Sequence, residues 1–218
     1  MYEFGGLYAD LDFECLKPLD KIMSEHECIL SEEPLMHAYL LYGLQKLVSN
    51  ALMACRPRHY YFESLINRLD YPAPKKTPLF TTGPIMFDKA YNEIIKKSKE
   101  ILCHDDDLTG SGSKEQFKEC KDDPFLAAPD IFQPKVDPRS VTSFKKKCSD
   151  KLRKRKDHKY NFIVKVCGRL KGHYENGPQK SSLTIHHWTH MWSKIYKNDK
   201  IYGAKQIPGT FSIKDIFK

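Results

Sequence analysis

Long hydrophobic runs are missing from this chain of 218 residues. Its most apolar stretch, residues 36–55, is interrupted by polar and basic side chains and lacks the run of roughly 18 apolar residues that a membrane-spanning helix requires. A signal peptide is not predicted, because Glu3 and Asp10 stand where a leader carries its basic and apolar regions. The sequence therefore predicts no membrane anchor within these residues.

Closely spaced cysteine pairs and internal repeats are also missing. The seven cysteines are spread along the chain without a C-x-x-C pair, which disfavours a zinc ribbon or a thioredoxin-like site. An odd cysteine count leaves at least one thiol unpaired in a monomer and is compatible with either redox compartment. Hydrophobic residues make up 40% of the chain, which excludes a fully disordered protein and is enough for a buried core at this length.

The net charge of +8 is concentrated in one segment. Residues 145–159 (KKKCSDKLRKRKDHK), here called the basic tract, contain nine lysines and arginines against two aspartates, so the rest of the chain is nearly neutral. The tract has no aromatic residue that could stack on a base, which favours a solvated loop or helix face over binding to RNA, DNA or anionic lipid. Nucleic acid is therefore not an expected partner.

Local periodicity predicts a mixture of strands and helices. Strands are predicted over residues 7–12, 28–32 and 160–167. Helices are predicted over residues 38–47, over residues 57–69 and from Pro84 onward. One buried face of the last helix would consist of Phe87, Ala90, Tyr91, Ile94 and Ile95. Alternating strands and helices predict an α/β layered fold.

The strongest local feature is the segment GGLYADLD, residues 5–12. Asp10 and Asp12 are two positions apart on extended backbone, so their carboxylates point to the same side and can bind one divalent cation. Gly5 and Gly6 allow a tight turn or a close approach to a ligand. Mg²⁺ and Mn²⁺ prefer such oxygen ligands and keep positions free for the oxygens of a leaving diphosphate.

The D-x-D pattern alone is a weak signal. Asp105 and Asp107 form the same pattern within residues 103–123, which are polar and predict a flexible, solvated acidic loop. For Asp10 and Asp12, the pattern by itself favours strand-end caps as much as a metal site. Only the preceding strand and Gly-Gly turn distinguish the first copy from the second.

Histidine and tryptophan gather in residues 185–192 (IHHWTHMW). His186 and His190 would share one face of a helix, as metal-binding histidines do. The glutamate of the H-E-x-x-H pattern is missing, which disfavours a hydrolytic zinc centre. A packed aromatic segment with hydrogen-bonded histidines is the interpretation that the residues alone favour.

Four segments of the chain together resemble glycosyltransferase family 32. Residues 4–12 (FGGLYADLD), followed by LKPLD, resemble the DXD sugar-binding region of that family. Three further segments resemble its motifs in the same order: residues 49–57 (SNALMACRP), residues 82–84 (TGP), and residues 185–188 (IHHW) with Trp192. The family includes initiating α-1,6-mannosyltransferases and inositol-phosphoceramide mannosyltransferases and is related to α-1,4-glycosyltransferases.

The resemblance implies a fold and a reaction. The fold would be GT-A, in which a Rossmann-like nucleotide-sugar half is joined to an acceptor half. The reaction would be the retaining transfer of a hexose, with mannose favoured, from a GDP- or UDP-sugar to a glycan or glycolipid acceptor. The cofactor would be Mn²⁺ or Mg²⁺.

The resemblance also assigns roles to residues by their position. Asp10, Asp12 and His186 would bind the metal. Substrate binding would involve Gly5, Gly6, Tyr8, Asn50, Gly83, Pro84, His187, Trp188 and Trp192. Gly83 can equally well be interpreted as a glycine that simply starts a helix. The two tryptophans can equally well be interpreted as residues that pack in the core. No nucleophile is assigned, because the leaving diphosphate of such an enzyme can itself deprotonate the acceptor.

The chain departs from the family in two places. No strand precedes the Gly-Gly turn, so an N-terminally truncated GT-A domain is expected, whose full-length form would be a type II membrane protein of the Golgi lumen. The second departure is an insertion over residues 135–181, which contains the basic tract. The predicted division is a DXD-containing core over residues 1–102, an acidic loop over 103–123, a return to the core over 124–134, the insertion over 135–181, and a C-terminal His/Trp motif and tail over 182–218.

Two alternatives remain open at the level of the sequence. The missing N-terminal strands are also compatible with a non-catalytic truncated relative or a gene-model fragment. A phosphatase of the haloacid-dehalogenase type, which likewise places D-x-D after a strand, is the weaker alternative. There a Thr or Val usually follows two residues after the second aspartate, whereas this chain has Phe13 and Glu14 after Asp12.

Overall fold

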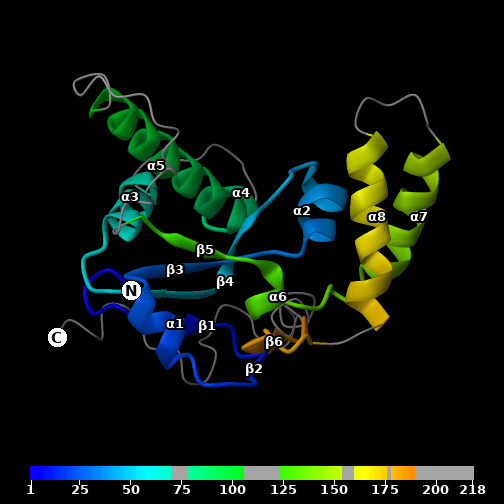
Figure 1. Cartoon of the computed structure of the whole chain (residues 1–218), viewed down its shortest axis with the longest axis horizontal. Helices are drawn as coiled ribbons and strands as arrows, with labels where there is room; N and C mark the ends of the chain where they lie inside the picture. The colour runs from blue at the N-terminus through cyan, green and yellow to red at the C-terminus, as the bar shows by residue number, and fades with distance from the viewer. Residues whose placement is uncertain (70–77, 106–122, 154–159, 176–177, 190–218) are drawn as a thin grey trace, which may run out of the picture. The chain divides into compact units, whose positions relative to one another are not determined.

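The computed structural model describes residues 1–69, 78–105, 123–153, 160–175 and 178–189 (Figure 1). The chain divides into two units, Met1–His187 and Trp188–Lys218, and only Trp188 and Thr189 of the second unit lie among the described residues. The first unit alternates between strands and helices, which confirms the predicted α/β class.

The main sheet of the first unit has four strands in the order β1-β4-β3-β5. They are β1 Gly6–Ala9, β4 Val48–Cys55, β3 Cys28–Glu32 and β5 Phe125–Ala127. β4 runs antiparallel to β1 and β3, whereas β5 is parallel to β3, so the sheet is mixed. A separate small sheet pairs β2 Phe13–Cys15 with β6 Thr184–His186 in antiparallel orientation.

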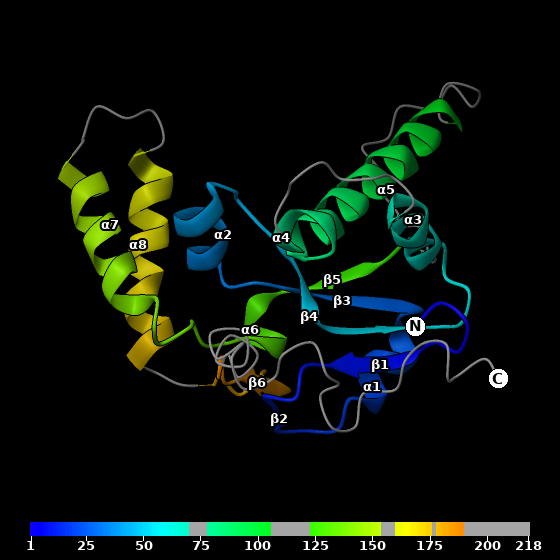
Figure 2. The ribbon, with the colours of Figure 1, turned by 180° about the vertical axis from the view of Figure 1, so that it is seen from behind.

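Helices cover both faces of the main sheet (Figures 1 and 2). On one face, α3 Tyr60–Leu69 and α5 Pro84–Asp105 pack their aromatic side chains against β3 and β4. On the other face, α1 Asp20–Glu25 and α6 Pro129–Phe132 lie against a second apolar cluster of the sheet. Burial from both sides explains why β3 and β4 are mostly apolar rather than alternating.

Three further helices form a cluster of their own. α2 Leu35–Tyr42 packs against α7 Val141–Arg153 and α8 Tyr160–Glu175, which lie side by side in both views (Figures 1 and 2). α4 Pro78–Thr81 directly precedes α5. None of the helices that the structure describes combines the length and the apolar character needed to cross a membrane.

Several predicted elements are confirmed. β3 lies where a strand was predicted, and α5 begins at Pro84 and buries Phe87, Ala90 and Tyr91. β1 covers only the first part of the strand predicted over residues 7–12, because the chain turns after Ala9. The basic tract lies in part on α7, where Lys145 and Lys146 are exposed beside the buried face of that helix, as expected for a solvated helix face. Residues 154–159 of the tract lie outside the described residues.

One predicted element was wrong, one strand was not predicted, and one predicted helix ends earlier than expected. Residues 160–167 belong to helix α8 rather than to a strand, because Ile163, Val166 and Leu170 recur at helical spacing and are buried together. The strand β4 falls where only the motif resemblance of residues 49–57 was noted. α2 ends at Tyr42 instead of reaching Leu47, because Gly43 adopts a left-handed conformation with a φ of 71° and terminates the helix.

The predicted acidic loop is also shorter than expected at its start. α5 continues to Asp105, so residues 103–105 are helical. Residues 106–122, which include Asp107, lie outside the described residues.

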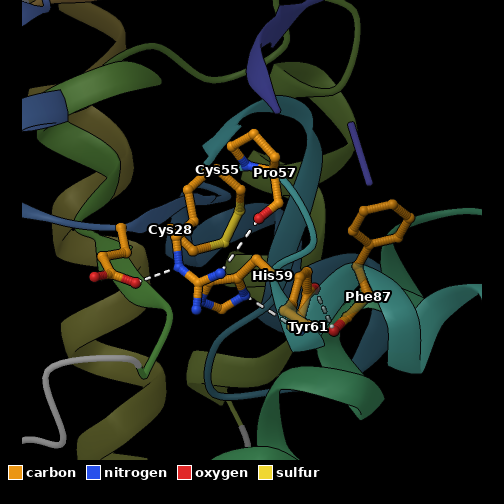
Figure 3. The surroundings of a disulfide bond; sticks show 8 residues. Cys28, Cys55, Pro57, His59, Tyr61 and Phe87 are labelled. Atoms are coloured by element: carbon orange, nitrogen blue, oxygen red, sulfur yellow. Dashed lines mark hydrogen bonds and ion pairs between the residues drawn. A yellow bond between two sulfur atoms is a disulfide. The ribbon is translucent and has the colours of Figure 1, made fainter. Parts of the chain in front are cut away.

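Two disulfides link neighbouring elements of the first unit. Cys28 and Cys55 join β3 to β4, where they are direct partners in the strand register, and Cys148 and Cys167 join α7 to α8. Figure 3 shows the first bridge beside His59 and Tyr61. Cys15 is a free, exposed thiol. Each disulfide therefore fixes one pair of packed elements.

Candidate metal site

The two predicted carboxylates follow directly from the end of β1. The backbone N–H of Asp10 donates to the carbonyl of Ala51 in β4, at 2.8 Å, and the N–H of Phe13 donates to the carbonyl of Asp10, at 3.1 Å. The chain thus turns between β1 and β2. Asp10 and Asp12 lie in this turn, beside the main sheet.

A strand from the far end of the chain completes the site. β2 pairs with β6 in a register that places Phe13 opposite His186. The backbone N–H of His187 also donates to the carbonyl of Asp12, at 2.9 Å. This pairing brings His186 beside Asp12 although 174 residues separate them.

The three predicted metal ligands meet at one place. His186 Nε2 lies 3.1 Å from Asp12 Oδ1, and one ligand atom from each of Asp10, Asp12 and His186 lies within 4.8 Å of the others. The His186 side chain is 6% exposed and that of Asp12 18% exposed, so the site opens to solvent on the carboxylate side. Two carboxylates and one imidazole suit a divalent ion such as Mn²⁺ that accepts both oxygen and nitrogen ligands.

Burial affects the protonation state of the His186 imidazole. Desolvation lowers the pKa of His186, while the charges of Asp12 and Asp10 and the hydrogen bond to Asp12 act in the opposite direction. The net lowering favours the neutral ring, which is the form that binds a metal ion.

Tyr8 supports the first carboxylate. Its hydroxyl group donates a hydrogen bond of 2.8 Å to Asp10 Oδ1. Partial burial, together with this hydrogen bond and the charge of Asp10, raises the pKa of Tyr8 to about 12. The phenol is therefore protonated at neutral pH and remains a donor to Asp10.

The two predicted glycines set the path of the chain into β1. Gly5 has a φ of 63°, and a Cβ atom there would lie 2.6 Å from the carbonyl oxygen of Cys55. Gly6 has a φ of 99° and pairs with Cys55 in the β1–β4 register. Both positions therefore require glycine for backbone reasons.

The remaining predicted site residues are placed as follows. His187 is exposed, and its Nε2 lies 2.9 Å from Glu14 Oε2. The carbonyl of Gly83 accepts hydrogen bonds from Met86 and Phe87, which fits a helix-start role, and Pro84 is the first residue of α5. Asn50 is half-buried in β4. Trp188 belongs to the second unit, and Trp192 lies outside the described residues.

A second group of potential ligands consists of Cys28, Cys55 and His59, all buried (Figure 3). Its two sulfur atoms are bonded to each other, and His59 Nδ1 accepts the backbone N–H of Tyr61 at 3.2 Å. A disulfide has no thiolate to offer a metal. Among the described residues, the group of Asp10, Asp12 and His186 is therefore the better metal site.

Comparison with known proteins adds a family context. No protein-family model and no solved structure matches the chain. Inositol phosphoceramide mannosyltransferase 2 of Schizosaccharomyces pombe is 31% identical over 90 residues, which is 39% of this chain and 23% of that protein. Inositol phosphoceramide mannosyltransferase 1 of the same organism is 31% identical over 91 residues, or 39% of this chain and 25% of that protein.

These similarities support a glycosyltransferase family relationship. The matched part spans about a quarter of the length of either relative. A transferase that uses a nucleotide sugar has to neutralise a departing diphosphate, and a divalent ion held by carboxylates is one means of doing so. The cluster at the end of β1 has the donor atoms for this task.

Sequence reasoning missed the residues behind His186. Gln133 is fully buried and lies 3.3 Å from His186 Nδ1 through its Oε1 atom, and Ser31 lies behind Gln133. Gln133 is the middle residue of an F-x-P segment and Ser31 lies in the predicted strand of residues 28–32, but neither was predicted to contribute to the site. The signal is a fully buried polar side chain at the end of α6, beside β6, and it becomes visible only when burial is known.

Proposed function

We propose that this chain carries the metal and diphosphate site of a retaining glycosyltransferase that moves a hexose, with mannose favoured, from a GDP- or UDP-sugar to a glycan or glycolipid acceptor. The observation that carries the proposal is the meeting of Asp10, Asp12 and His186. The similarity to two proteins named inositol phosphoceramide mannosyltransferases supports a mannosyl donor and a glycolipid acceptor. The order of the four motif segments supports family 32 and a GT-A arrangement.

Each residue of the site has a separate task in the proposed reaction. Asp10, Asp12 and His186 Nε2 would hold Mn²⁺ or Mg²⁺, which when bound offsets the charge of the leaving diphosphate. Tyr8 holds Asp10 in place through its hydroxyl group. Gly5 and Gly6 shape the turn that aims β1 at the site. No protein nucleophile is assigned.

The two disulfides support an oxidising compartment. We therefore expect the reaction to take place in the lumen of the secretory pathway, with the Golgi as the favoured organelle.

The test is the binding of Mn²⁺ and of GDP or UDP to the purified chain by isothermal titration calorimetry. Asp12→Asn should reduce Mn²⁺ affinity at least about 10-fold, because it removes one charged ligand. Asp150→Asn on α7, which replaces an exposed aspartate outside the four motif segments, is the matched control and should leave Mn²⁺ affinity unchanged.

Other outcomes would point to the alternatives. Binding of metal and nucleotide sugar without transfer or hydrolysis would favour a non-catalytic relative. Release of phosphate from an aryl phosphate, abolished by Asp10→Asn, would favour a phosphatase. Absence of Mn²⁺ and nucleotide binding would contradict the proposed function itself.

A further inference from the structure

A chain of buried hydrogen bonds runs from His186 into the main sheet. Gln133 Oε1 lies 3.3 Å from His186 Nδ1, and Gln133 Nε2 lies 3.1 Å from Ser31 Oγ. Ser31 Oγ in turn lies 2.8 Å from the carbonyl oxygen of Leu52 in β4. Gln133 and Ser31 are both 0% exposed, so this chain is shielded from water.

The chemistry of these groups fixes the direction of every hydrogen bond. The carbonyl of Leu52 can only accept, so the hydroxyl proton of Ser31 points toward it. Ser31 Oγ then accepts from Gln133, which requires the amide nitrogen of Gln133 to face Ser31 and its Oε1 to face His186. Because Gln133 Oε1 can only accept, His186 Nδ1 has to be the donor.

The proton on Nδ1 decides what the other ring nitrogen can do. In a neutral imidazole with its proton on Nδ1, Nε2 carries a lone pair. His186 Nε2 faces Asp12, at 3.1 Å. Phe13 stacks on the imidazole ring with centroids 4.4 Å apart and planes inclined by 15°, which restricts rotation of the ring. Nε2 and the carboxylate oxygen of Asp12 can face each other at this distance only with a proton or a cation between them, so the lone pair would be available to a cation bound at Asp10 and Asp12.

We propose that Gln133, oriented by Ser31, is a positioning residue that holds His186 in the Nδ1–H tautomer and so presents Nε2 as a ligand to the divalent cation at Asp10 and Asp12. The inference rests on the proposed function for the existence of that cation site. The opposite tautomer would direct an N–H group at Asp12 and leave no nitrogen ligand for the metal. Gln133 touches neither the metal nor a substrate in this arrangement.

Mn²⁺ binding to the full 218-residue chain provides the first test. Gln133→Leu removes the acceptor at similar size and should weaken Mn²⁺ affinity about 10- to 100-fold, the usual effect of losing such an outer partner. Gln133→Glu keeps an acceptor oxygen and should retain affinity within about 3-fold. The free Mn²⁺ signal in electron paramagnetic resonance measures both.

Thr184→Val provides a matched control. It removes another buried hydrogen bond of β6, the 2.7 Å bond from Thr184 Oγ1 to the carbonyl of Phe132, without altering the partners of the imidazole. Its Mn²⁺ affinity should equal that of the wild type. If Gln133→Leu fails to fold, Ser31→Ala, which frees the amide of Gln133 to rotate, should still weaken Mn²⁺ binding about 3- to 10-fold.

Two further measurements separate positioning from general destabilisation. In a His186→Ala background, Gln133→Leu should cause no additional loss of Mn²⁺ affinity, because Gln133 affects metal binding only by orienting the imidazole of His186. In Co²⁺-loaded protein, the hyperfine-shifted N–H proton of the bound imidazole should exchange slowly with D₂O in the wild type and in Gln133→Glu. It should exchange rapidly in Gln133→Leu.

The outcomes distinguish the inference from the proposed function. If the wild type binds Mn²⁺ and Gln133→Leu binds it equally well, the role of Gln133 is refuted while the metal site stands. An additive loss in the His186→Ala background, or a similar loss in Thr184→Val, would likewise refute positioning. If the wild type binds no Mn²⁺, the metal site of the proposed function is lost and the positioning role with it.

Discussion

At the scale of single residues, Gly5 occupies a position that no other residue can adopt without strain. Its φ of 63° lies in the left-handed region, and an added Cβ would meet the carbonyl oxygen of Cys55 at 2.6 Å and the nitrogen of Pro57 at 2.7 Å. Both neighbours are backbone atoms that cannot rotate away. The entrance to β1, and with it the placement of Asp10, depends on this contact.

Gly5→Ala should therefore destabilise the fold by at least about 2 kcal/mol, as expected for backbone strain combined with overpacking. Gly168→Ala is the matched control. Gly168 lies in α8 with nothing within 4 Å of an added Cβ, so alanine there should stabilise the protein by about 0.5–1 kcal/mol. Urea denaturation measures both changes, and equal behaviour of the two variants would contradict the prediction.

The raised pKa of Tyr8 makes the stability of the protein depend on pH in the alkaline range. Its pKa is raised to about 12 through burial, the hydrogen bond to Asp10 and the charge of Asp10, whereas an unfolded tyrosine titrates near 10.0. The unfolded chain therefore loses this proton at lower pH than the folded chain does. The contribution of Tyr8 to stability is fully present below pH 10 and is lost as the pH rises from 10 to about 12.

Absorbance of the phenolate at alkaline pH should resolve this group. Tyr8→Phe should remove one late-titrating phenol near pH 12. If Tyr8→Phe leaves the titration near pH 12 as it was, the assigned cause is wrong.

At the scale of elements, the two disulfides each connect a pair that is also packed. Cys28–Cys55 closes a loop with a sequence separation of 27, and Cys148–Cys167 one of 19. Loop-closure entropy predicts a contribution of about 3–4 kcal/mol from each bridge, with a small advantage for the longer loop. The two disulfides should therefore contribute about equally to the free energy of unfolding.

Replacing both cysteines of either bridge by serine should lower the free energy of unfolding by about 2–4 kcal/mol. Cys15→Ser, which removes a free exposed thiol, should leave stability unchanged. Reduction with dithiothreitol before urea denaturation provides an independent check. A wild-type protein whose unfolding midpoint does not respond to reduction would contradict the prediction.

The helices α5 and α8 show where a local sequence pattern identifies an element correctly and where it does not. The buried stripe of α5 is visible in the sequence because Phe87, Ala90 and Tyr91 recur at the helical period. α8 was mistaken for a strand because its β-branched residues Ile163, Val164 and Val166 have strand propensity. In the structure Val164 is 45% exposed while Ile163 and Val166 are buried, a distribution set by packing against α2 and α7.

At the scale of the whole molecule, a cation at the site would connect segments from both ends of the first unit. Asp10 and Asp12 come from the turn after β1, and His186 comes from β6. A ligand that binds only the folded arrangement stabilises that arrangement by mass action. Metal binding should therefore increase the thermal stability of the whole unit.

Mn²⁺ at 100 times its dissociation constant should add about 2.7 kcal/mol to the stability of the folded protein. For a chain of this size this corresponds to an increase in Tm of roughly 5–10 °C. The increase should disappear in Asp12→Asn and persist in Asp150→Asn. A Tm that responds equally to Mn²⁺ in both variants would indicate binding somewhere other than the Asp10 and Asp12 turn.

Local features of the site could be predicted from the sequence alone. The alternation of residues 7–9 and the glycines before them specify the strand β1 and its entry, whereas Asp10 and Asp12 lie in the turn after β1 and not on the extended backbone that the spacing predicted. The strand and its entry depend on neighbours within a few residues, so a local pattern is sufficient to reveal them.

The completed site depends on tertiary structure. His186 reaches Asp12 only because β2 pairs with β6 across 174 residues, and no local period encodes which distant strand will be the partner. The sequence suggested His186 through a motif resemblance, but it did not place Gln133 or Ser31 beside His186. Their importance comes from burial and from the direction of their hydrogen bonds, and both properties exist only once β3, α6 and β6 have packed together.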